Sequence, residues 1–385
     1  MATTALHNAP NMSLRIALLT YSTKPRGSVI HTLELADALC KLGHQPCVFA
    51  LDKDGQGFHR QVDFQTCAVP ADPYEGDIDG LIKQRIGEFV LFFEGLLQRF
   101  DVYHAQDCLS ANALALLREK GDIPHFLRTV HHIESFRSPY LQDCQEKSIY
   151  QPDRCLCVSD LWQQVLKTEY GIAAHRVING VSDRFSTEPD GLENLVAETY
   201  GINRQPVYLT VGGIEPRKNS IRLLQAFEQV RATQPLAQLV IAGGATLFDY
   251  QDYRDAFMAI AQVDDLKEAL VLPGVVPDEM LPALYRLADA FVFPSVKEGW
   301  GLVVLEAIAS GLPVLTANRA PFTEFLSSEE ACLVEPENVE AIAAGMLSIT
   351  QPRPRPISPE TITQRYSWQT SAQMHLDLYR QLQSI

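Results

Sequence analysis

DAFVFPSVKEGWGLVVLEAIASGLP, residues 289–313, places a strand, a glycine-spaced loop and a helix in direct succession. The run at 290–293 is apolar and β-rich, and a proline–serine turn follows it. Residues 302–310 have the composition of an apolar helix, which the following Gly-Leu-Pro ends. The loop between them is therefore predicted at the carboxyl end of a strand and the amino end of a helix, where open parallel sheets bind ligands.

Two carboxylates flank this junction. Glu298 lies in the loop, and Glu306 lies about one and a half turns into the helix. Both are near the positive end of the helix, where the first amides lack intrahelical partners, and Gly299 and Gly301 let a ligand approach that backbone. Taken singly, either acid is better interpreted as a solvated residue that complements the helix dipole. Together with the free amides they favour a hydroxyl-rich ligand that carries an anion, such as a nucleotide sugar.

The segment EGWGLVVLEAIASGLPV, 298–314, resembles the E-x7-E signature of the retaining nucleotide-sugar glycosyltransferases with the GT-B fold, glycosyltransferase family 4 in particular. Shorter motifs extend the resemblance over nearly the whole chain. It implies an α/β protein of two Rossmann-like domains that face each other across a cleft. It also implies that the C-terminal helix packs back on the N-terminal domain.

The composition is that of an ordinary globular protein. A chain of 385 residues, 46% hydrophobic and 21% charged, is long for one core and predicts two domains. The net charge of −15 argues against a nucleic-acid partner and against a basic membrane-binding surface. No apolar run approaches the roughly 20 residues of a membrane span, and the N-terminus has no signal-peptide core, so we expect a cytoplasmic protein.

Strand and helix patterns alternate along the chain and define the expected domains. A polar linker with a turn composition begins near residue 183 and separates them. The predicted organisation is a disordered lead-in (1–12), an N-terminal acceptor-side domain (13–185), a C-terminal nucleotide-sugar-binding domain (186–365) and a returning C-terminal helix (366–385).

The first strand, 14–21, and a helix expected at 31–44 enclose a loop that contains Gly27 and Ser28. A glycine before a helix start can hold a phosphate, and a plain strand–helix connector is the competing interpretation. The family usually has Gly-Gly here, so the resemblance assigns Gly27 and Ser28 to donor binding, with less backbone freedom at the second position.

His131 ends the strand pattern at 125–135 in the sequence T-V-H-H. A single histidine at a strand end is more often structural than catalytic. The segment resembles the family's Thr-x-His, whose histidine faces the donor sugar, and that register selects His131. His132 is the alternative, because one residue along a strand changes faces.

Arg217 and Lys218 lie in GGIEPRKNS, 212–220, between a strand end and a helix start. Being adjacent, both can reach one atom only if the loop curls around it. The segment resembles the family's phosphate clamp, with Gly213 in place of its first arginine and Arg217 as a replacement. The competing interpretation is a pair of solvated surface cations, which the position at a strand end disfavours.

The remaining roles come from the resemblance alone. Glu306 would hold the ribose hydroxyls, Glu298 the sugar hydroxyls, and the clamp the leaving diphosphate, while the backbone beside Val276 would contact the nucleobase. Glu324 is expected to cap a loop and to have no catalytic role. The predicted catalytic group is His131, Glu298, Lys218 and Arg217, and the predicted donor-binding group is Gly27, Ser28, Val276, Gly299, Trp300, Gly301, Leu302 and Glu306.

The predicted function is a retaining glycosyltransferase of the hexosyltransferase type (EC 2.4). It would move a sugar from a nucleoside diphosphate sugar, its co-substrate, to a hydroxyl acceptor that the sequence does not identify. No cofactor or metal is expected, since the cationic side chains of the clamp can supply the electrostatic stabilisation. The alternatives are a non-catalytic nucleotide-sugar-binding protein and, with less support, a GT-B nucleotide-sugar epimerase. Peripheral membrane contact is a further alternative that the few cations of 79–100 disfavour.

Overall fold

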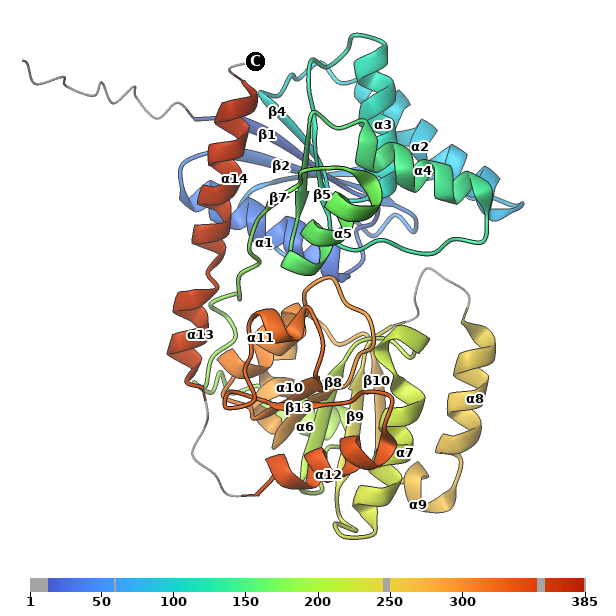
Figure 1. Ribbon diagram of the computed structural model, residues 1–385, viewed down its shortest axis with the longest axis vertical. Helices are drawn as coiled ribbons and strands as arrows, with labels where there is room; N and C mark the ends of the chain where they lie inside the picture. Colours follow the sequence, from blue (N-terminus) through green and yellow to red (C-terminus); the bar gives the residue numbers. More distant parts are fainter. Residues whose placement is uncertain (1–12, 59, 245–249, 352–356, 384–385) are drawn as a thin grey trace, which may run out of the picture. The chain divides into compact units, whose positions relative to one another are not determined.

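A computed structural model describes residues 13–58, 60–244, 250–351 and 357–383 (Figure 1). The predicted lead-in at 1–12 lies outside the described residues. The chain divides into two compact units, each built on one parallel sheet. Unit 1 contains the residues up to 157 together with 166–177 and 371–385, and unit 2 contains 158–165 and 178–370.

Unit 1 has a seven-stranded sheet in the order β3-β2-β1-β4-β5-β6-β7, in which every pair is parallel. The order reverses between β1 and β4, and in such sheets ligands bind outside the strand ends at that point. The strands are β1 (Arg15–Thr20), β2 (Gln45–Asp52), β3 (Gln65–Pro70), β4 (Val102–Ala105), β5 (Leu127–Val130), β6 (Arg154–Cys157) and β7 (His175–Arg176).

Helices flank the sheet of unit 1 (Figure 1). Phe49 on β2 contacts Phe93 on α2 at a ring separation of 4.8 Å, and both side chains are buried in one core cluster. The last helix, α14, belongs to this unit from residue 371 onward, which confirms that the end of the chain returns to the first domain. The helices are α1 (Gly27–Lys41), α2 (Ile78–Glu94), α3 (Cys108–Glu119), α4 (Pro139–Tyr150), α5 (Asp160–Tyr170) and α14 (Trp368–Leu382). Helix α5 belongs to unit 1 only from residue 166 onward.

Unit 2 has a six-stranded parallel sheet in the order β10-β9-β8-β11-β12-β13, which reverses between β8 and β11. The strands are β8 (Val207–Val211), β9 (Gln238–Ala242), β10 (Leu270–Gly274), β11 (Ala290–Phe293), β12 (Val314–Ala317) and β13 (Cys332–Val334). The helices are α6 (Glu193–Tyr200), η1 (Pro216–Lys218), α7 (Ser220–Arg231), α8 (Gln251–Ala261), α9 (Asp264–Lys267), α10 (Leu281–Leu287), α11 (Leu302–Ala309), η2 (Phe322–Glu324), α12 (Val339–Ile349) and α13 (Pro359–Arg365).

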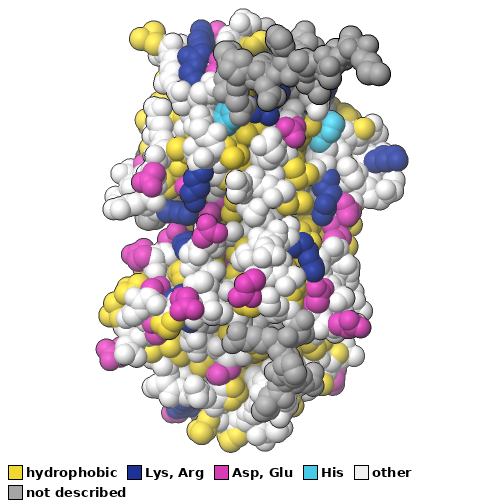
Figure 2. All heavy atoms as spheres, turned by 90° about the vertical axis from the view of Figure 1, so that its left-hand side faces the viewer, with side chains coloured by type: hydrophobic (Ala, Val, Ile, Leu, Met, Phe, Trp, Pro, Cys, Tyr) yellow, Lys and Arg dark blue, Asp and Glu magenta, His cyan; other side chains and the backbone are white. Residues whose placement is uncertain are grey.

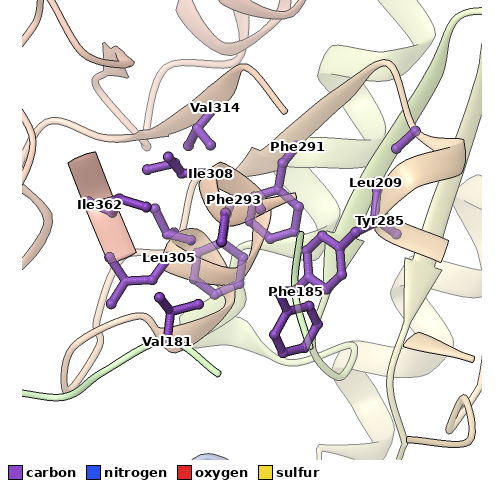
Figure 3. Packing of buried hydrophobic residues seen from close by; sticks show 14 of the residues in the cluster. Val181, Phe185, Leu209, Tyr285, Phe291, Phe293, Leu305, Ile308, Val314 and Ile362 are labelled. Atoms are coloured by element: carbon purple, nitrogen blue, oxygen red, sulfur yellow. The ribbon is translucent and has the colours of Figure 1, made fainter. Parts of the chain in front are cut away.

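Both faces of this second sheet are buried. Tyr208 and Leu209 are neighbours on β8, so their side chains point to opposite faces, and they belong to two different core clusters. In one of these clusters the rings of Phe185, Tyr285 and Phe291 lie against one another, with centroid separations of 5.4 and 5.6 Å (Figure 3). Strands buried on both faces explain the continuous apolar runs of the sequence. The two parallel sheets confirm the predicted pair of Rossmann-like domains.

The unit boundaries differ from the predicted ones. After a short excursion into unit 2 at 158–165, the chain leaves unit 1 at 177/178, whereas the prediction places this boundary at 185/186; Val181 and Phe185 are buried in a core cluster of unit 2. The return to unit 1 begins at 371 instead of 366, because Tyr366 also belongs to that core.

Some predicted elements also change. The first helix begins at Gly27, four residues earlier than the apolar pattern indicates. Helix α4 was not predicted, because the face that it buries is formed largely by Cys144, Gln145 and Ser148 instead of an apolar stripe. The edge strand β3 was missed for a similar reason, since Val69 is the buried hydrophobic residue that it contributes.

Charged side chains of both signs are interspersed over the face shown in Figure 2. No broad patch of side chains with one sign of charge is visible there. On this face the net charge of −15 is therefore not concentrated in one area. Within the described residues, no helix combines the length and apolar character that crossing a membrane requires.

Candidate functional site

Two loops of unit 2 meet where its sheet reverses order. One follows β8 and leads through η1 into α7, and the other follows β11 and leads into α11. Val296 N donates to the Arg217 carbonyl oxygen at 2.8 Å, and Ser295 Oγ lies 2.7 Å from the same oxygen, so the single Ser295 hydroxyl proton is shared between this carbonyl and Glu298. These contacts hold the loops together at the carboxyl edge of the sheet.

Glu298 is the centre of this site. Its Oε1 accepts three hydrogen bonds, from Lys218 Nζ at 2.6 Å, Ser295 Oγ at 2.7 Å and Arg217 Nη1 at 3.1 Å. Burial acts to raise the pKa of Glu298, but Lys218 and Arg217 outweigh it and hold that pKa below its usual range. Glu298 is therefore an ionised, acceptor-only group in a largely buried position.

The adjacent Arg217 and Lys218 reach the same oxygen because the loop curls. Pro216–Lys218 form a 3₁₀ turn, and Asn219 follows with φ of 63°, the positive value that asparagine tolerates best after glycine. The Asn219 amide donates to the Pro294 carbonyl oxygen at 3.1 Å. Asn219 therefore anchors the turn. This role was not predicted, although an asparagine directly after two cations could have indicated it.

Lys218 and Arg217 have different surroundings. The Lys218 side chain is 13% exposed, and its Nζ lies 4.5 Å from the centroid of the Phe293 ring. Burial and the neighbouring Arg217 lower the pKa of Lys218. Arg217 is 31% exposed and also pairs with Glu215 at 3.0 Å. Arg217 can therefore change partners at lower cost than Lys218.

Glu306 lies in α11 and is buried. Tyr285 on α10 donates its hydroxyl to Glu306 Oε2 at 2.8 Å. Burial and the Glu306 carboxylate raise the pKa of Tyr285 well above its usual value, so the phenol remains a donor. The Tyr285 ring is also buried in the core of the unit, which orients the carboxylate from behind. No pattern in the sequence pointed to Tyr285.

The amino end of α11 is built for close approach. Gly301 has φ of 110°, and a Cβ on it would lie 2.7 Å from the Phe322 ring, so a larger residue is excluded. Gly301 caps the helix without a side-chain hydrogen bond, and Leu302 begins the helix. The backbone at Gly299 belongs to the same loop. The amides of the first turn therefore have no side-chain cap.

Trp300 does not contribute its side chain to the loop surface. The indole is 2% exposed and stacks on Phe325 at a centroid separation of 4.7 Å, with Tyr366 at 5.6 Å. The predicted donor contact of Trp300 is thus restricted to its backbone.

The loops that follow β8, β9 and β10 lie at the same carboxyl edge of the sheet. A Cβ on Gly243 would lie 2.4 Å from the Gly212 carbonyl carbon, so these two backbones are in contact. Val276, the residue predicted beside the nucleobase, is partly buried against the core, while its neighbour Val275 is 60% exposed.

In unit 1, Gly27 and Ser28 are the first two residues of α1 instead of loop residues. The helix has no side-chain cap, and Ile30 N donates to the Arg26 carbonyl oxygen at 2.8 Å. The residues are accordingly at a helix amino end, as an anion site requires, although that position alone does not establish one.

His131 directly follows β5 and is a partly buried member of a group of closely packed imidazoles. Its Nε2 lies 3.1 Å from Gln106 Oε1, and its ring meets His31 on α1 edge to face at 4.6 Å. Burial, with the nearby His31 and Arg128, lowers the pKa of His131 well below its ordinary value. His131 is therefore neutral, and the alternative His132 is instead paired with Glu134 at 2.8 Å.

The imidazole group extends to the C-terminal helix. His375 on α14 lies 6.0 Å from His31 and 5.7 Å from His104, measured between ring centroids. His104 is hydrogen bonded through Nδ1 to the Tyr379 hydroxyl and through Nε2 to Thr129 Oγ1, both at 2.8 Å. Burial lowers the pKa of His375 to about 4. These side chains form the histidine cluster of unit 1: His31, His104, His131 and His375.

Glu324 has the structural role that was expected. Its carboxylate accepts from the backbone N–H groups of Asp160 at 2.7 Å and Leu161 at 2.8 Å, at the start of α5. Among the described residues, no group of three or more histidine, cysteine, aspartate or glutamate side chains has the arrangement of a metal site.

Comparison with known proteins agrees with this geometry. The profile described as "Glycosyltransferase Family 4" matches residues 25–184, and that described as "Glycosyl transferases group 1" matches residues 197–360. The chain belongs to glycosyltransferase family 4. The two matches together span most of the chain, and the Glu298 site lies within the second of them.

Among relatives of this family 4 chain is the O-antigen chain mannosyltransferase B of Escherichia coli, 28% identical over 60% of this chain and 63% of the relative. The GDP-mannose-dependent alpha-(1-6)-phosphatidylinositol monomannoside mannosyltransferase of Mycolicibacterium smegmatis is 30% identical over 43% of this chain and 44% of the relative. The chain thus spans about half the length of these curated relatives. The structure of HepE from Anabaena in complex with UDP-glucose has a TM-score of 0.76 at 18% identity, over 97% of this chain and 100% of that one. That likeness shows the GT-B fold.

Proposed function

We propose that this protein transfers a hexose from a nucleoside diphosphate sugar to a hydroxyl acceptor, with retention at the anomeric carbon. The observation that carries the proposal is the convergence of Lys218 Nζ and Arg217 Nη1 on Glu298 Oε1, at the reversal point of the unit 2 sheet. Parallel sheets bind nucleotides at that point, and an anionic donor needs cations there in a protein of net charge −15.

The charges of the site suit a donor with a diphosphate and a sugar. Ionised Glu298 can only accept hydrogen bonds, so sugar hydroxyls are its natural ligands. Lys218 and Arg217 can only donate hydrogen bonds, so phosphate oxygens are their natural ligands. When a donor binds, Arg217 can turn from Glu298 to the diphosphate while Glu215 and Lys218 keep the local charge balanced.

The residues of α11 supply the remaining contacts. Glu306, oriented by Tyr285, would accept hydrogen bonds from the ribose hydroxyls. The amides from Gly299 to Leu302 would orient the sugar, and Gly301 allows the close approach that this requires. His131 is proposed to accept a hydrogen bond from a sugar hydroxyl.

In the reaction, the bond between the anomeric carbon and the phosphate oxygen breaks, and a bond to the acceptor oxygen forms on the same face. The acceptor's proton passes to the departing phosphate oxygen. Lys218 and Arg217 stabilise the negative charge that develops there, so the charge that a metal ion could supply comes from side chains. Glu298 Oε1 already accepts three hydrogen bonds, which disfavours that oxygen as a nucleophile.

The donor's base and sugar are proposed from the relatives. One curated relative is named for GDP-mannose, and the HepE structure holds UDP-glucose. Val276 and the neighbouring backbone would contact the base without a side-chain code, which is compatible with either nucleotide.

The test is the release of nucleoside diphosphate from a panel of UDP-, GDP- and ADP-sugars, with and without a chelator. We expect slow release from one donor, unaffected by the chelator. Lys218→Met should lower the rate by about ten- to a hundredfold, since a charged hydrogen bond contributes about 1.5–3 kcal/mol. Lys218→Arg keeps the charge and is the matched control.

Two results would contradict the proposal. Donor binding without any release would make the protein a nucleotide-sugar-binding protein. Unchanged donor affinity in both Lys218→Met and Glu306→Ala would show that the donor binds elsewhere. Once an acceptor is found, the anomeric configuration of the product, read by NMR, decides between retention and inversion.

A further inference from the structure

Gln106 directly follows β4 and is 1% exposed. Its backbone N–H donates to the Leu19 carbonyl oxygen at 2.9 Å, so the residue is attached to the end of β1. Its side chain lies between two imidazoles of the histidine cluster: Oε1 is 3.1 Å from His131 Nε2, and Nε2 is 3.4 and 3.5 Å from the two ring nitrogens of His104.

The orientation of this amide follows from electrostatics. The amide nitrogen of Gln106 is nearly equidistant from both His104 nitrogens, which places an N–H group against the electron-rich ring. Those two nitrogens already have closer partners in Tyr379 and Thr129 at 2.8 Å. The amide oxygen is therefore the atom that faces His131.

An amide oxygen can only accept a hydrogen bond, so His131 Nε2 must carry the proton. The groups that face His131 are His31, His104, His132 and Arg128, and each acts with burial to disfavour a second proton on the ring. His131 is then a neutral imidazole with an unprotonated Nδ1, for which no hydrogen-bond partner exists among the described residues.

We propose that Gln106 is a positioning residue: it holds His131 as the Nε2–H tautomer, so that Nδ1 accepts a hydrogen bond from a hydroxyl of the donor sugar. This inference rests on the proposed function for the identity of the ligand. The tautomer itself depends on unit 1 alone.

The frame beneath Gln106 explains why the tautomer is held. His104 is restrained by Tyr379 of α14 and by Thr129 of β5, and all three are buried. Gln106 packs on that restrained ring, so its amide cannot rotate without losing both imidazole contacts. The C-terminal helix thereby supports the orientation of His131.

The test uses ¹⁵N NMR of the histidine rings in the full chain, with Gln106→Met and Gln106→Glu. In the parent, His131 should show a protonated Nε2 and an unprotonated Nδ1. Gln106→Met should give a mixture of tautomers. Gln106→Glu has nearly the parent's shape but places a carboxylate on Nε2, so it should raise the pH at which His131 titrates. Asn112→Leu removes another buried amide of unit 1, bonded to Cys108 and Cys144 carbonyl oxygens at 2.8 Å, and should leave His131 unchanged.

Donor binding provides the second readout, with UDP-glucose and GDP-mannose as probes. Gln106→Met should weaken binding of the accepted donor about tenfold, as expected for one misplaced hydrogen bond of about 1.4 kcal/mol, whereas Asn112→Leu should not. An unchanged Nε2–H tautomer and titration in both Gln106 variants would overturn the inference. If the parent binds no nucleoside diphosphate sugar, the proposed function fails while the NMR result still decides the role of Gln106 on His131. If Gln106→Met does not fold, Gln106→Glu decides alone.

Discussion

The Glu298 site of unit 2 and the histidine cluster of unit 1 occupy equivalent places in two sheets of the same topology. Each lies beside the reversal of strand order, between β8 and β11 in one unit and between β1 and β4 in the other. Both bury several titratable side chains. Unit 2 keeps its groups charged by pairing Glu298 with Lys218 and Arg217, whereas burial in unit 1 holds the pKa values of His104 and His131 well below their ordinary range.

The difference shows two ways to bury polar groups at a ligand edge. A carboxylate and a cation offset each other's desolvation, and their charges remain available for a charged ligand. Imidazoles avoid the desolvation cost by losing the proton, and then offer directional donors and acceptors. A diphosphate calls for the cations of the first arrangement, whereas sugar hydroxyls can be bound by the acceptors of either arrangement.

The largest expected effect breaks the charged arrangement. Glu298→Gln leaves Lys218 buried without its carboxylate, which should lower the free energy of unfolding of unit 2 by about 3–5 kcal/mol. Trp162, Trp300 and Trp368 all lie in unit 2, so tryptophan fluorescence in urea measures this unit. Glu198→Gln, an exposed position of the same unit, is the matched control. Equal stability of the two variants would mean that the pairing contributes nothing net.

The second effect concerns the neutral arrangement and appears in acid. Burial lowers the pKa of His375 from 6.5 to about 4, so the unfolded chain binds the extra proton first. Stability should therefore fall as the pH drops from about 6.5 toward 4. At 1.36 kcal/mol per pKa unit this is about 3 kcal/mol from His375, and His104 and His131 act in the same direction.

His375→Leu should remove much of that acid loss in thermal unfolding followed by circular dichroism. Its neutral-pH stability should change by about 1 kcal/mol, since one hydrogen bond to the Ser371 carbonyl is lost. Asn112→Leu replaces a buried side chain of the same unit that does not titrate, and should keep the parent's acid profile. An acid profile of His375→Leu identical to the parent's would refute the neutral state of the cluster.

The smallest effect tests whether a buried neighbour must orient the ligand-binding group in unit 2, as Gln106 is proposed to orient His131 in unit 1. Tyr285→Phe removes the hydroxyl that donates to Glu306 at 2.8 Å. We expect donor affinity to fall about tenfold in calorimetric titration, for a loss of about 1.5 kcal/mol. Tyr208→Phe removes a hydroxyl bonded to Gln234 at 2.7 Å in the same unit and should leave affinity unchanged. Equal affinities in both variants would assign Tyr285 to packing alone.

Local patterns in the sequence were enough for the strand–helix alternation and for the loops that carry Lys218, Glu298 and Glu306. Apolar runs, glycine spacing and cations at strand ends act over a few residues, so they can be recognised without knowing the partners. The same locality explains the misplaced start of α1 and the missed α4, whose buried face includes Cys144, Gln145 and Ser148 and carries no apolar stripe.

Tertiary structure alone decided which of these groups meet. Strand order places the loop after β8 beside the loop after β11, and only then do Arg217, Lys218 and Ser295 converge on one oxygen. The Tyr379–His104 hydrogen bond joins residues 275 positions apart. Such contacts depend on which sheet faces and edges can be buried together, a property of the folded packing that no short stretch of sequence carries.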